Sequence, residues 1–296
     1  GACTEIEKVK RETMARILKG SEVAQAINER TARQVETLHA AGVTPTLAIL
    51  RVGERPDDIS YEKGARKRCE SLGVAVRQVT LAADVTQEAF DRELIMLNED
   101  SAVHGILLFR PLPPQLDDER ARQMLAPGKD VDGCTDGSLA GVFTNTENGF
   151  CPCTAQAAME ILDYYGIDCQ GRNAVVIGRS LVVGRPAAML LMHRHATPTI
   201  CHTKTQKIEE IVKRADIVIV CAGKMESGSS YFRAGQTVID VGIGWNEAKG
   251  KLCGDVDFDA VEPLVEAITP VPGGVGAVTT SVLVSHVVEA AARSLG

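Results

Sequence analysis

Aromatic side chains are scarce in this chain, since only 4% of its 296 residues are Phe, Trp or Tyr. Proteins that hold single-stranded nucleic acid usually offer rings on which bases stack. The net charge of −7 and the absence of a long basic run also disfavour nucleic acid as a partner. No apolar run is long enough to cross a bilayer and no signal peptide is visible, so we expect no membrane partner and a cytoplasmic location.

The nine cysteines are scattered, and no two form the C-x-x-C pair that is typical of zinc sites. Cys151 and Cys153 are separated by one residue, which is too close for a usual zinc knuckle. We therefore expect reduced thiols that serve packing, and no bound metal. Cys201 and His202, with His193 or His195, leave a metal site as an alternative, although a Cys-His pair at a strand end is more often structural.

Apolar, β-branched runs alternate with helix-compatible stretches along the chain, which is long enough for two domains. We assign no function to residues 1–13, and a last helix is predicted over 281–294. The alternation predicts parallel sheets covered by helices. The predicted strands are 45–52, 74–81 and 103–109 in the first half, and 173–177, 197–201, 217–221 and 237–241 in the second.

One stretch, NAVVIGRSLVVGRP at 173–186, combines a strand, a glycine turn and a helix start. Free N–H groups and the helix dipole make such a turn a site for an anion, here the pyrophosphate of a dinucleotide. Gly178 and Gly184 are spaced G-x-x-x-x-x-G instead of the usual G-x-G-x-x-G. An ordinary turn between a strand and a helix is the alternative.

The region about twenty residues after the glycine turn bears on which nucleotide fits. An NAD site carries an acidic residue there, which binds the ribose. Residues 201–205 read CHTKT and contain no acid. Arg179, Thr203 and Lys204 could instead hold a 2′-phosphate, so we expect NADP, with NAD as the alternative.

Six motifs in a fixed order point to a family: KDVDG (129–133), PCT (152–154), GRSLVVGRP (178–186), CHTKT (201–205), GDVDF (254–258) and TPVPGGVG (269–276). Together they resemble the methylenetetrahydrofolate dehydrogenase/cyclohydrolase family, from Met14 to the end of the chain. The resemblance implies an α/β protein with an N-terminal folate domain and a C-terminal Rossmann-like NAD(P) domain. A cleft would lie between them, and the last helix would return to the first domain.

The resemblance also implies domain limits, an assembly and a substrate. The folate domain would comprise 1–154 and 281–296, and the NAD(P) domain 155–280. A homodimer is usual in the family, and the substrate is a one-carbon adduct of tetrahydrofolate.

Site residues follow from the same resemblance. Tyr61 would stack on the folate ring system and Asp130 would bind the pterin. The loop closing over the substrate would consist of Pro272, Gly273, Gly274, Val275 and Gly276. The cofactor would contact Gly178, Arg179, Ser180, Thr203 and Ile243.

Two positions depart from the family pattern. The family's catalytic Lys falls on Ala65, and the Gln that holds this Lys falls on Phe109. Lys63 and Lys67 each lie two residues from position 65, so on a helix they point away from it. Arg68 stays protonated and is a poor base, and Arg110 follows Phe109 on an alternating strand end and faces the opposite way. None of these neighbours is a good replacement.

The two reactions of the family need different chemistry. Hydride transfer from the methylene group to a nicotinamide asks for alignment and the exclusion of water. Hydrolysis of the methenyl group asks for a group of tuned pKa that carries a proton. We therefore expect a methylenetetrahydrofolate dehydrogenase with weak or absent cyclohydrolase activity.

Three alternatives stay open. The chain could be the ordinary bifunctional enzyme, with an unrecognised group that serves hydrolysis. It could be a binding protein for folate or nucleotide without catalysis. It could also be a different α/β dehydrogenase, such as an amino-acid or shikimate-type enzyme.

Overall fold

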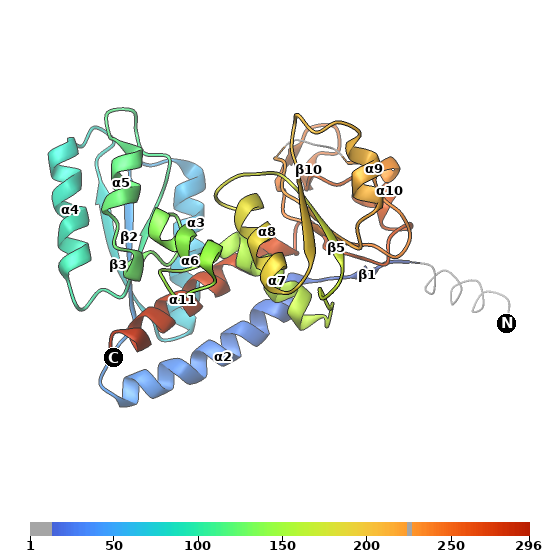
Figure 1. Ribbon diagram of the computed structural model, residues 1–296. Coiled ribbons are helices and arrows are strands. Elements are labelled where there is room, and N and C mark those ends of the chain that lie inside the picture. The colour runs from blue at the N-terminus through green and yellow to red at the C-terminus, as the bar shows by residue number, and fades with distance from the viewer. Residues whose placement is uncertain (1–13, 224–226) are drawn as a thin grey trace. The chain divides into compact units, whose positions relative to one another are not determined.

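The structure is a computed structural model that describes residues 14–223 and 227–296 (Figure 1). The chain divides into two compact units. One unit comprises Thr154–Val278 together with the start of the chain up to Val23, and the other comprises Ala24–Cys153 and Thr279–Gly296. The start of the chain was predicted to belong with the first domain. It belongs with the other unit because β1 (Arg16–Ile17) pairs in parallel with β11 (Ala267–Ile268).

The unit that contains Ala24–Cys153 is built on a parallel sheet of three strands in the order β3-β2-β4. The strands are β2 (Thr46–Val52), β3 (Ala75–Leu81) and β4 (Gly105–Leu108), as the apolar runs predict. The helices are α2 (Gly20–Ala40, whose first residues belong to the other unit), α3 (Pro56–Ser71), α4 (Gln87–Glu99), α5 (Asp118–Met124), α6 (Asp136–Thr144) and α11 (Thr279–Arg293), with a short 3-10 turn η1 (Pro127–Lys129).

β2 and β4 are buried on both faces, which explains why they are mostly apolar, whereas β3 at the edge of the sheet is partly exposed and carries Arg77, Gln78 and Thr80. Side chains alternate along a strand, and Ala48, Leu50 and Val52 pack into one cluster with buried residues of α4 and α5. On the other face, α11 packs against α3, β2 and β4 (Figure 1). Each fully buried Leu or Val contributes about 1.5–3 kcal/mol relative to an exposed one.

The segment Val275–Arg293, which contains α11, is long and apolar enough to cross a bilayer by length and composition. This corrects the expectation that no such run exists. However, 61% of the segment is buried inside the protein. Its apolar character is therefore accounted for by packing against the sheet.

The other unit is a doubly wound α/β domain with a parallel sheet in the order β1-β11-β8-β7-β5-β6. Its predicted strands are confirmed to within one residue: β5 (Asn173–Ile177), β6 (Thr197–Cys201), β7 (Ile217–Val220) and β8 (Thr237–Asp240). The helices are α7 (Cys153–Tyr164), α8 (Gly184–His193), α9 (Ile208–Lys213) and α10 (Phe258–Val261), with 3-10 turns η2 (Ser229–Tyr231) and η3 (Val275–Ala277) and a hairpin of β9 (Gly244–Asn246) and β10 (Lys251–Cys253).

Gly105, the first residue of β4, leaves room for the side chain of Val131. A Cβ added to Gly105 would lie 2.7 Å from Val131 Cγ1 and 3.2 Å from Val287 Cγ2 of α11. Val131 and Val287 are both fully buried. The missing side chain of Gly105 therefore lets Val131 sit between the sheet and α11.

We predict that Gly105→Ala lowers the free energy of unfolding by about 1–3 kcal/mol, because overpacking at a buried site forces its neighbours to move. Gly64→Ala is the matched control. Gly64 lies in the middle of α3, and a Cβ added there would have no neighbouring atom within 4 Å. Gly64→Ala should therefore raise the free energy of unfolding by about 0.5–1 kcal/mol, because alanine has the higher helix propensity. Urea unfolding curves measure both, and equal effects would contradict the packing argument.

Candidate functional site

Two aromatic rings meet where β4 ends. Tyr61 lies on α3, and Phe109 directly follows β4 and donates its N–H to the Leu50 carbonyl. Their rings pack edge to face, with centroids 5.8 Å apart and planes at 85°. Ala65 lies one helical turn after Tyr61 and is fully buried. The positions where the family pattern has Lys and Gln thus hold apolar groups beside Tyr61.

Asp130, predicted to bind the pterin, is engaged in hydrogen bonds within its own loop. It is fully buried, and its carboxylate accepts hydrogen bonds from Cys134 N (3.0 Å), Thr135 N (2.8 Å) and Ser138 Oγ (2.6 Å). Thr135 is the N-cap of α6. Both carboxylate oxygens of Asp130 are therefore engaged in holding the start of α6.

Asp132 is the carboxylate of this loop that faces Tyr61. Burial and the neighbouring charge of Asp130 raise the pKa of Asp132 to about 7, while a hydrogen bond with the Cys153 thiol and the charge of Arg110 act in the opposite direction. Near neutral pH, Asp132 therefore exists in both protonation states. The pterin contact of Asp130 stays a prediction, and Asp132 is a second candidate, because spacing alone does not say which of two carboxylates is bonded within the protein.

Tyr61 is adjacent to these acidic groups. Burial, followed by the charges of Asp132 and Cys153, raises the pKa of Tyr61 well above its usual value of 10. The hydroxyl therefore stays protonated at neutral pH and can donate a hydrogen bond. Its ring offers an aromatic surface next to Phe109.

Basic residues near Ala65 do not supply a replacement amine. Lys63 and Lys67 are exposed on α3, as the helical spacing predicts. Arg110 forms an ion pair with Asp118, and the Asp118 carboxylate also accepts from Leu112 N at 3.0 Å. Arg68 is partly buried on the same helix.

In the other unit, the glycine turn between β5 and α8 is close-packed. A Cβ at Gly178 would lie 2.5 Å from the Cys221 carbonyl oxygen, and a Cβ at Gly184 would lie 2.2 Å from the Gly178 carbonyl oxygen. Gly178 also has a φ of 134°, which favours glycine. The two glycines of this unusual spacing are therefore required for the turn to close on itself.

The start of α8 can receive an anion. Val183 caps the helix without a side-chain bond, Arg185 N donates to the Ser180 carbonyl at 3.0 Å, and Pro186 has no N–H. The Gly184 N–H is therefore the first-turn donor that is left for a ligand. Arg179 and Ser180 are exposed beside it, with Ser180 Oγ accepting from Val183 N at 3.0 Å. Arg185 Nε donates to the Arg179 carbonyl at 2.9 Å. The turn thus presents a backbone donor and positive charge together.

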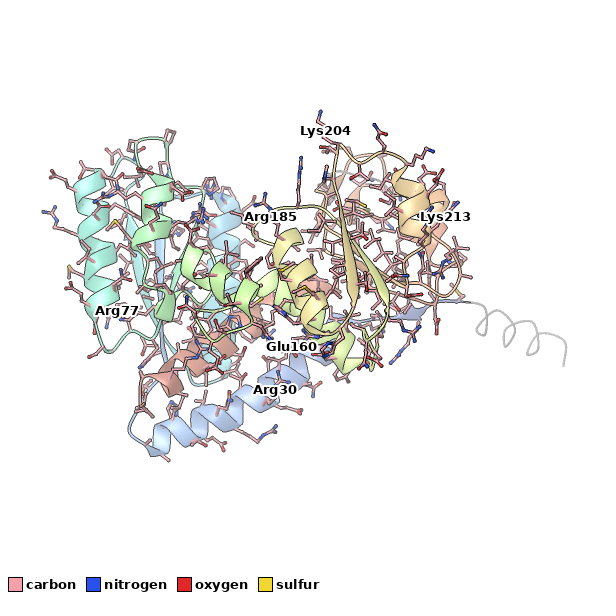
Figure 2. The ribbon with its side chains drawn as sticks, viewed as in Figure 1. Arg30, Arg77, Glu160, Arg185, Lys204 and Lys213 are labelled. Carbon is pink, nitrogen blue, oxygen red and sulfur yellow. The ribbon has the colours of Figure 1, made fainter. Side chains whose placement is uncertain are left out.

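The loop after β6 emerges at the same edge of the sheet as the glycine turn, because β5 and β6 are parallel neighbours. Thr203 and Lys204 are exposed in this loop, and Lys204 projects away from the ribbon (Figure 2). His202 N donates to Thr205 Oγ1 at 2.8 Å, which shapes the turn. The described residues of this loop contain no acid that would disfavour a 2′-phosphate.

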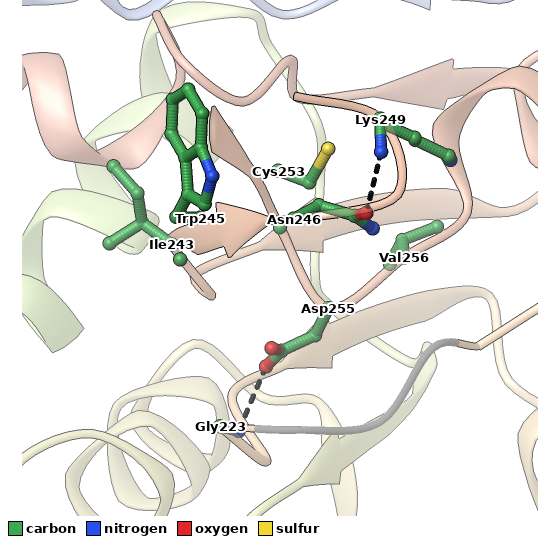
Figure 3. A pocket seen from close by; sticks show the side chains of 10 residues that line it. Gly223, Ile243, Trp245, Asn246, Lys249, Cys253, Asp255 and Val256 are labelled. Carbon is green, nitrogen blue, oxygen red and sulfur yellow. Dashed lines mark hydrogen bonds between the residues drawn. The ribbon is translucent and has the colours of Figure 1, made fainter. Parts of the chain in front are cut away.

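A hollow of about 360 Å³ lies beyond the ends of β7 and β8 in the same unit (Figure 3). Ile243 lies at its rim and is 64% exposed. Asp255 spans the hollow's base, where its carboxylate accepts from Gly223 N at 3.0 Å. The lining includes Ile243 and Trp245 but not Gly178, Arg179, Ser180 or Thr203. Sequence reasoning missed Trp245 and Asp255, although Asp255 lies in the GDVDF motif.

The loop predicted to close over the substrate follows β11 in this unit. Pro272, Gly273 and Gly276 are exposed, while Gly274 and Val275 are buried. The Gly273 carbonyl accepts from Gly20 N at 2.8 Å, and Gly20 leaves no room for a Cβ against the Gly274 carbonyl. The start of α2 therefore anchors this loop.

Across residues 14–223 and 227–296, no group of three or more His, Cys, Asp or Glu side chains is arranged to hold a metal ion. Cys201 is buried at the end of β6. The alternative metal site therefore receives no support from these residues.

A doubly wound domain with an anion-binding glycine turn, joined to a second α/β unit with a buried acidic loop, defines the class of nucleotide-dependent α/β enzymes. Family models specify the class further. The model of the tetrahydrofolate dehydrogenase/cyclohydrolase catalytic domain matches residues 18–132, and that of the NAD(P)-binding domain of the same family matches residues 152–295. The chain belongs to the tetrahydrofolate dehydrogenase/cyclohydrolase family.

Individual relatives are similar over nearly the whole chain. The bifunctional protein FolD of Carboxydothermus hydrogenoformans is 48% identical over 279 residues, covering 94% of this chain and 97% of that protein. The crystal structure of the bifunctional enzyme FolD from Campylobacter jejuni has a TM-score of 0.91 at 36% identity, covering 94% of this chain and 99% of that one. The Trypanosoma brucei enzyme, solved with NADP and an inhibitor, has a TM-score of 0.88 at 36% identity, with 95% and 99% coverage.

Proposed function

We propose that this protein oxidises 5,10-methylenetetrahydrofolate to the 5,10-methenyl form and transfers the hydride to NADP. The observation that carries the proposal is the match of both family domains along the chain. It is supported by the Tyr61 ring and the Asp132 carboxylate at one site. We further propose a cytoplasmic homodimer, as expected for the family.

The residues of the Tyr61 site would bind the folate by two kinds of contact. The Tyr61 ring would stack on the pterin, and the Asp132 carboxylate would accept hydrogen bonds from its ring N–H and amino groups. Hydride transfer needs no proton carrier. The work of these residues is to orient the methylene carbon and to keep water away from it.

We predict that kcat/KM for methylenetetrahydrofolate falls as the pH drops below about 7, because only ionised Asp132 accepts two hydrogen bonds. Asp132→Asn should lower kcat/KM about 10–100-fold at pH 8, the cost of a lost charged hydrogen bond, and should remove this acid limb. Asp84→Asn, at an exposed position, is the control. An acid limb that persists in the Asp132→Asn enzyme would assign the titration to another group.

The proposed nucleotide site lies at the glycine turn. NADP supplies a nicotinamide ring that accepts the hydride. The first turn of α8 would hold the pyrophosphate, while Arg179, Ser180, Thr203 and Lys204 would surround the 2′-phosphate. Ile243 would contact the cofactor from the loop after β8. The lack of an acid at 201–205 favours NADP over NAD.

We predict that Arg179→Ala raises KM for NADP about tenfold or more, the value of a charge-assisted contact to phosphate, and changes KM for NAD much less. Arg172→Ala is the matched control, since Arg172 is exposed immediately before β5, at the opposite edge of the sheet. Initial rates with each nucleotide measure this. Equal losses with NADP and NAD would remove Arg179 from phosphate recognition.

Methenyl hydrolysis is the second candidate function. The relatives from Carboxydothermus and Campylobacter are both named as bifunctional. These names support the bifunctional alternative better than the loss of cyclohydrolase activity that we expected from the sequence. Methenyl hydrolysis needs a direct test because the side chains beside Tyr61 have no group that can carry a proton. Ala65 is buried there and Phe109 packs on the Tyr61 ring.

One assay separates these functions: the decay of methenyltetrahydrofolate with enzyme, measured above the buffer rate. Because no proton carrier lies beside Tyr61, the wild-type enzyme should hydrolyse methenyltetrahydrofolate slowly. Ala65→Lys alone should raise the hydrolysis rate little, whereas Ala65→Lys combined with Phe109→Gln should raise it about 10²-fold or more. Lys63→Ala is the control for an exposed lysine on α3. Fast hydrolysis by wild type would instead establish the bifunctional enzyme, and its loss in Lys63→Ala would identify the amine responsible.

A further inference from the structure

His286 of α11 is a buried histidine outside the residues used above. It is 3% exposed, and its Nδ1 lies 2.7 Å from the Val131 carbonyl oxygen. A carbonyl only accepts hydrogen bonds, so Nδ1 carries the proton in this contact. His286 therefore donates a hydrogen bond to the loop that carries Asp132.

The ring of His286 is itself held in place. It packs on Phe150 with centroids 5.1 Å apart, and the guanidinium of Arg293 covers Phe150 at 4.3 Å. Arg293 also donates to the Gly149 carbonyl at 2.9 Å. The donor is therefore presented by a rigid group and not by a freely rotating side chain.

Val131 is fixed by side chain and backbone together. Its side chain fills the space left by Gly105, and its carbonyl accepts from His286 and also from the Cys153 thiol at 3.3 Å. The thiol has one proton, and it also hydrogen-bonds the Asp132 side chain. Cys153 Sγ also lies 3.7 Å from His286 Nδ1, but at 2.7 Å the Val131 carbonyl is the closer partner, so His286 is the main donor to this carbonyl.

We propose that His286 is a positioning residue for the folate site: its Nδ1–H holds the Val131 carbonyl and thereby sets the direction of the adjacent Asp132 carboxylate. This inference rests on the proposed function in that Asp132 is taken to bind the pterin. The neighbouring Asp130 carboxylate fixes the end of the same loop at Cys134 and Thr135, so His286 holds the Val131 carbonyl, which Asp130 does not contact.

The test compares two variants, His286→Asn and His286→Gln, whose side-chain amide N–H groups lie at different distances from the backbone. In His286→Asn, the amide nitrogen takes the place of Nδ1, whereas in His286→Gln it lies one bond farther out. His286→Asn should keep KM for methylenetetrahydrofolate within about threefold of wild type, and His286→Gln should raise it about tenfold or more, as expected for a lost hydrogen bond that orients a ligand group. In both variants kcat should change less than KM, and KM for NADP should not change.

Leu94→Ala is the control for loss of stability in the same unit, since Leu94 is fully buried in α4, in the cluster on the other face of the sheet from α11. It should leave KM for the folate unchanged although it lowers the melting temperature. The inference is overturned if His286→Gln has the wild-type KM, if His286→Asn behaves like His286→Gln, or if Leu94→Ala raises KM equally.

Hydrogen exchange of the peptide that spans 126–136 provides a readout without substrate. Exchange should be faster in His286→Gln than in His286→Asn or wild type, because the clamp on the loop is released. A wild-type protein that oxidises no methylenetetrahydrofolate would refute the proposed function alone, and the exchange comparison would still decide the role of His286. Equal exchange in all three proteins would refute the clamp.

Discussion

The buried carboxylate of Asp130 is the interaction on which the folate site depends. A carboxylate that leaves water must have its oxygens satisfied, and here two backbone N–H groups and the Ser138 hydroxyl do so. This bonding ties the loop to the start of α6. It leaves Asp132, two residues later, as the carboxylate that faces Tyr61.

The same loop shows how two neighbouring acids acquire different roles. The charge of Asp130 and the burial of Asp132 both disfavour a second negative charge, so the pKa of Asp132 rises to about 7. Arg110 and the Cys153 thiol offset part of this cost. A carboxyl whose pKa is raised by burial and a neighbouring like charge is the kind of group that is found at functional sites.

In the nucleotide-binding unit, steric fit determines where an anion can be received. Gly178 and Gly184 lie so close to backbone oxygens that no side chain fits at either position. The helix α8 begins directly at this contact, and because Arg185 N is bonded to the Ser180 carbonyl and Pro186 has no N–H, the Gly184 N–H is the first-turn donor that is left for a ligand. Although the glycines have an unusual spacing, the helix still begins beyond the carboxyl ends of the parallel strands, where nucleotides bind in such domains.

Much of this protein could be determined from the sequence by itself, because it rests on local patterns. Apolar, β-branched runs gave β5, β6, β7 and β8 to within a residue, and the order of the motifs gave the family. The replacement of Lys and Gln by Ala65 and Phe109 is also readable without coordinates. Such features depend on residues that are close together in the chain or on the family pattern.

Only the tertiary structure could show that Asp130 is bonded to the start of α6, and that β1 joins the sheet of the other unit. The donor from His286 lies 155 residues from the carbonyl of Val131 that it holds, and no spacing rule reaches that far. Burial and hydrogen-bond partners come from segments that meet only after folding. The sequence therefore identified the chemistry available in each motif, while the packing of distant segments assigned that chemistry to individual atoms.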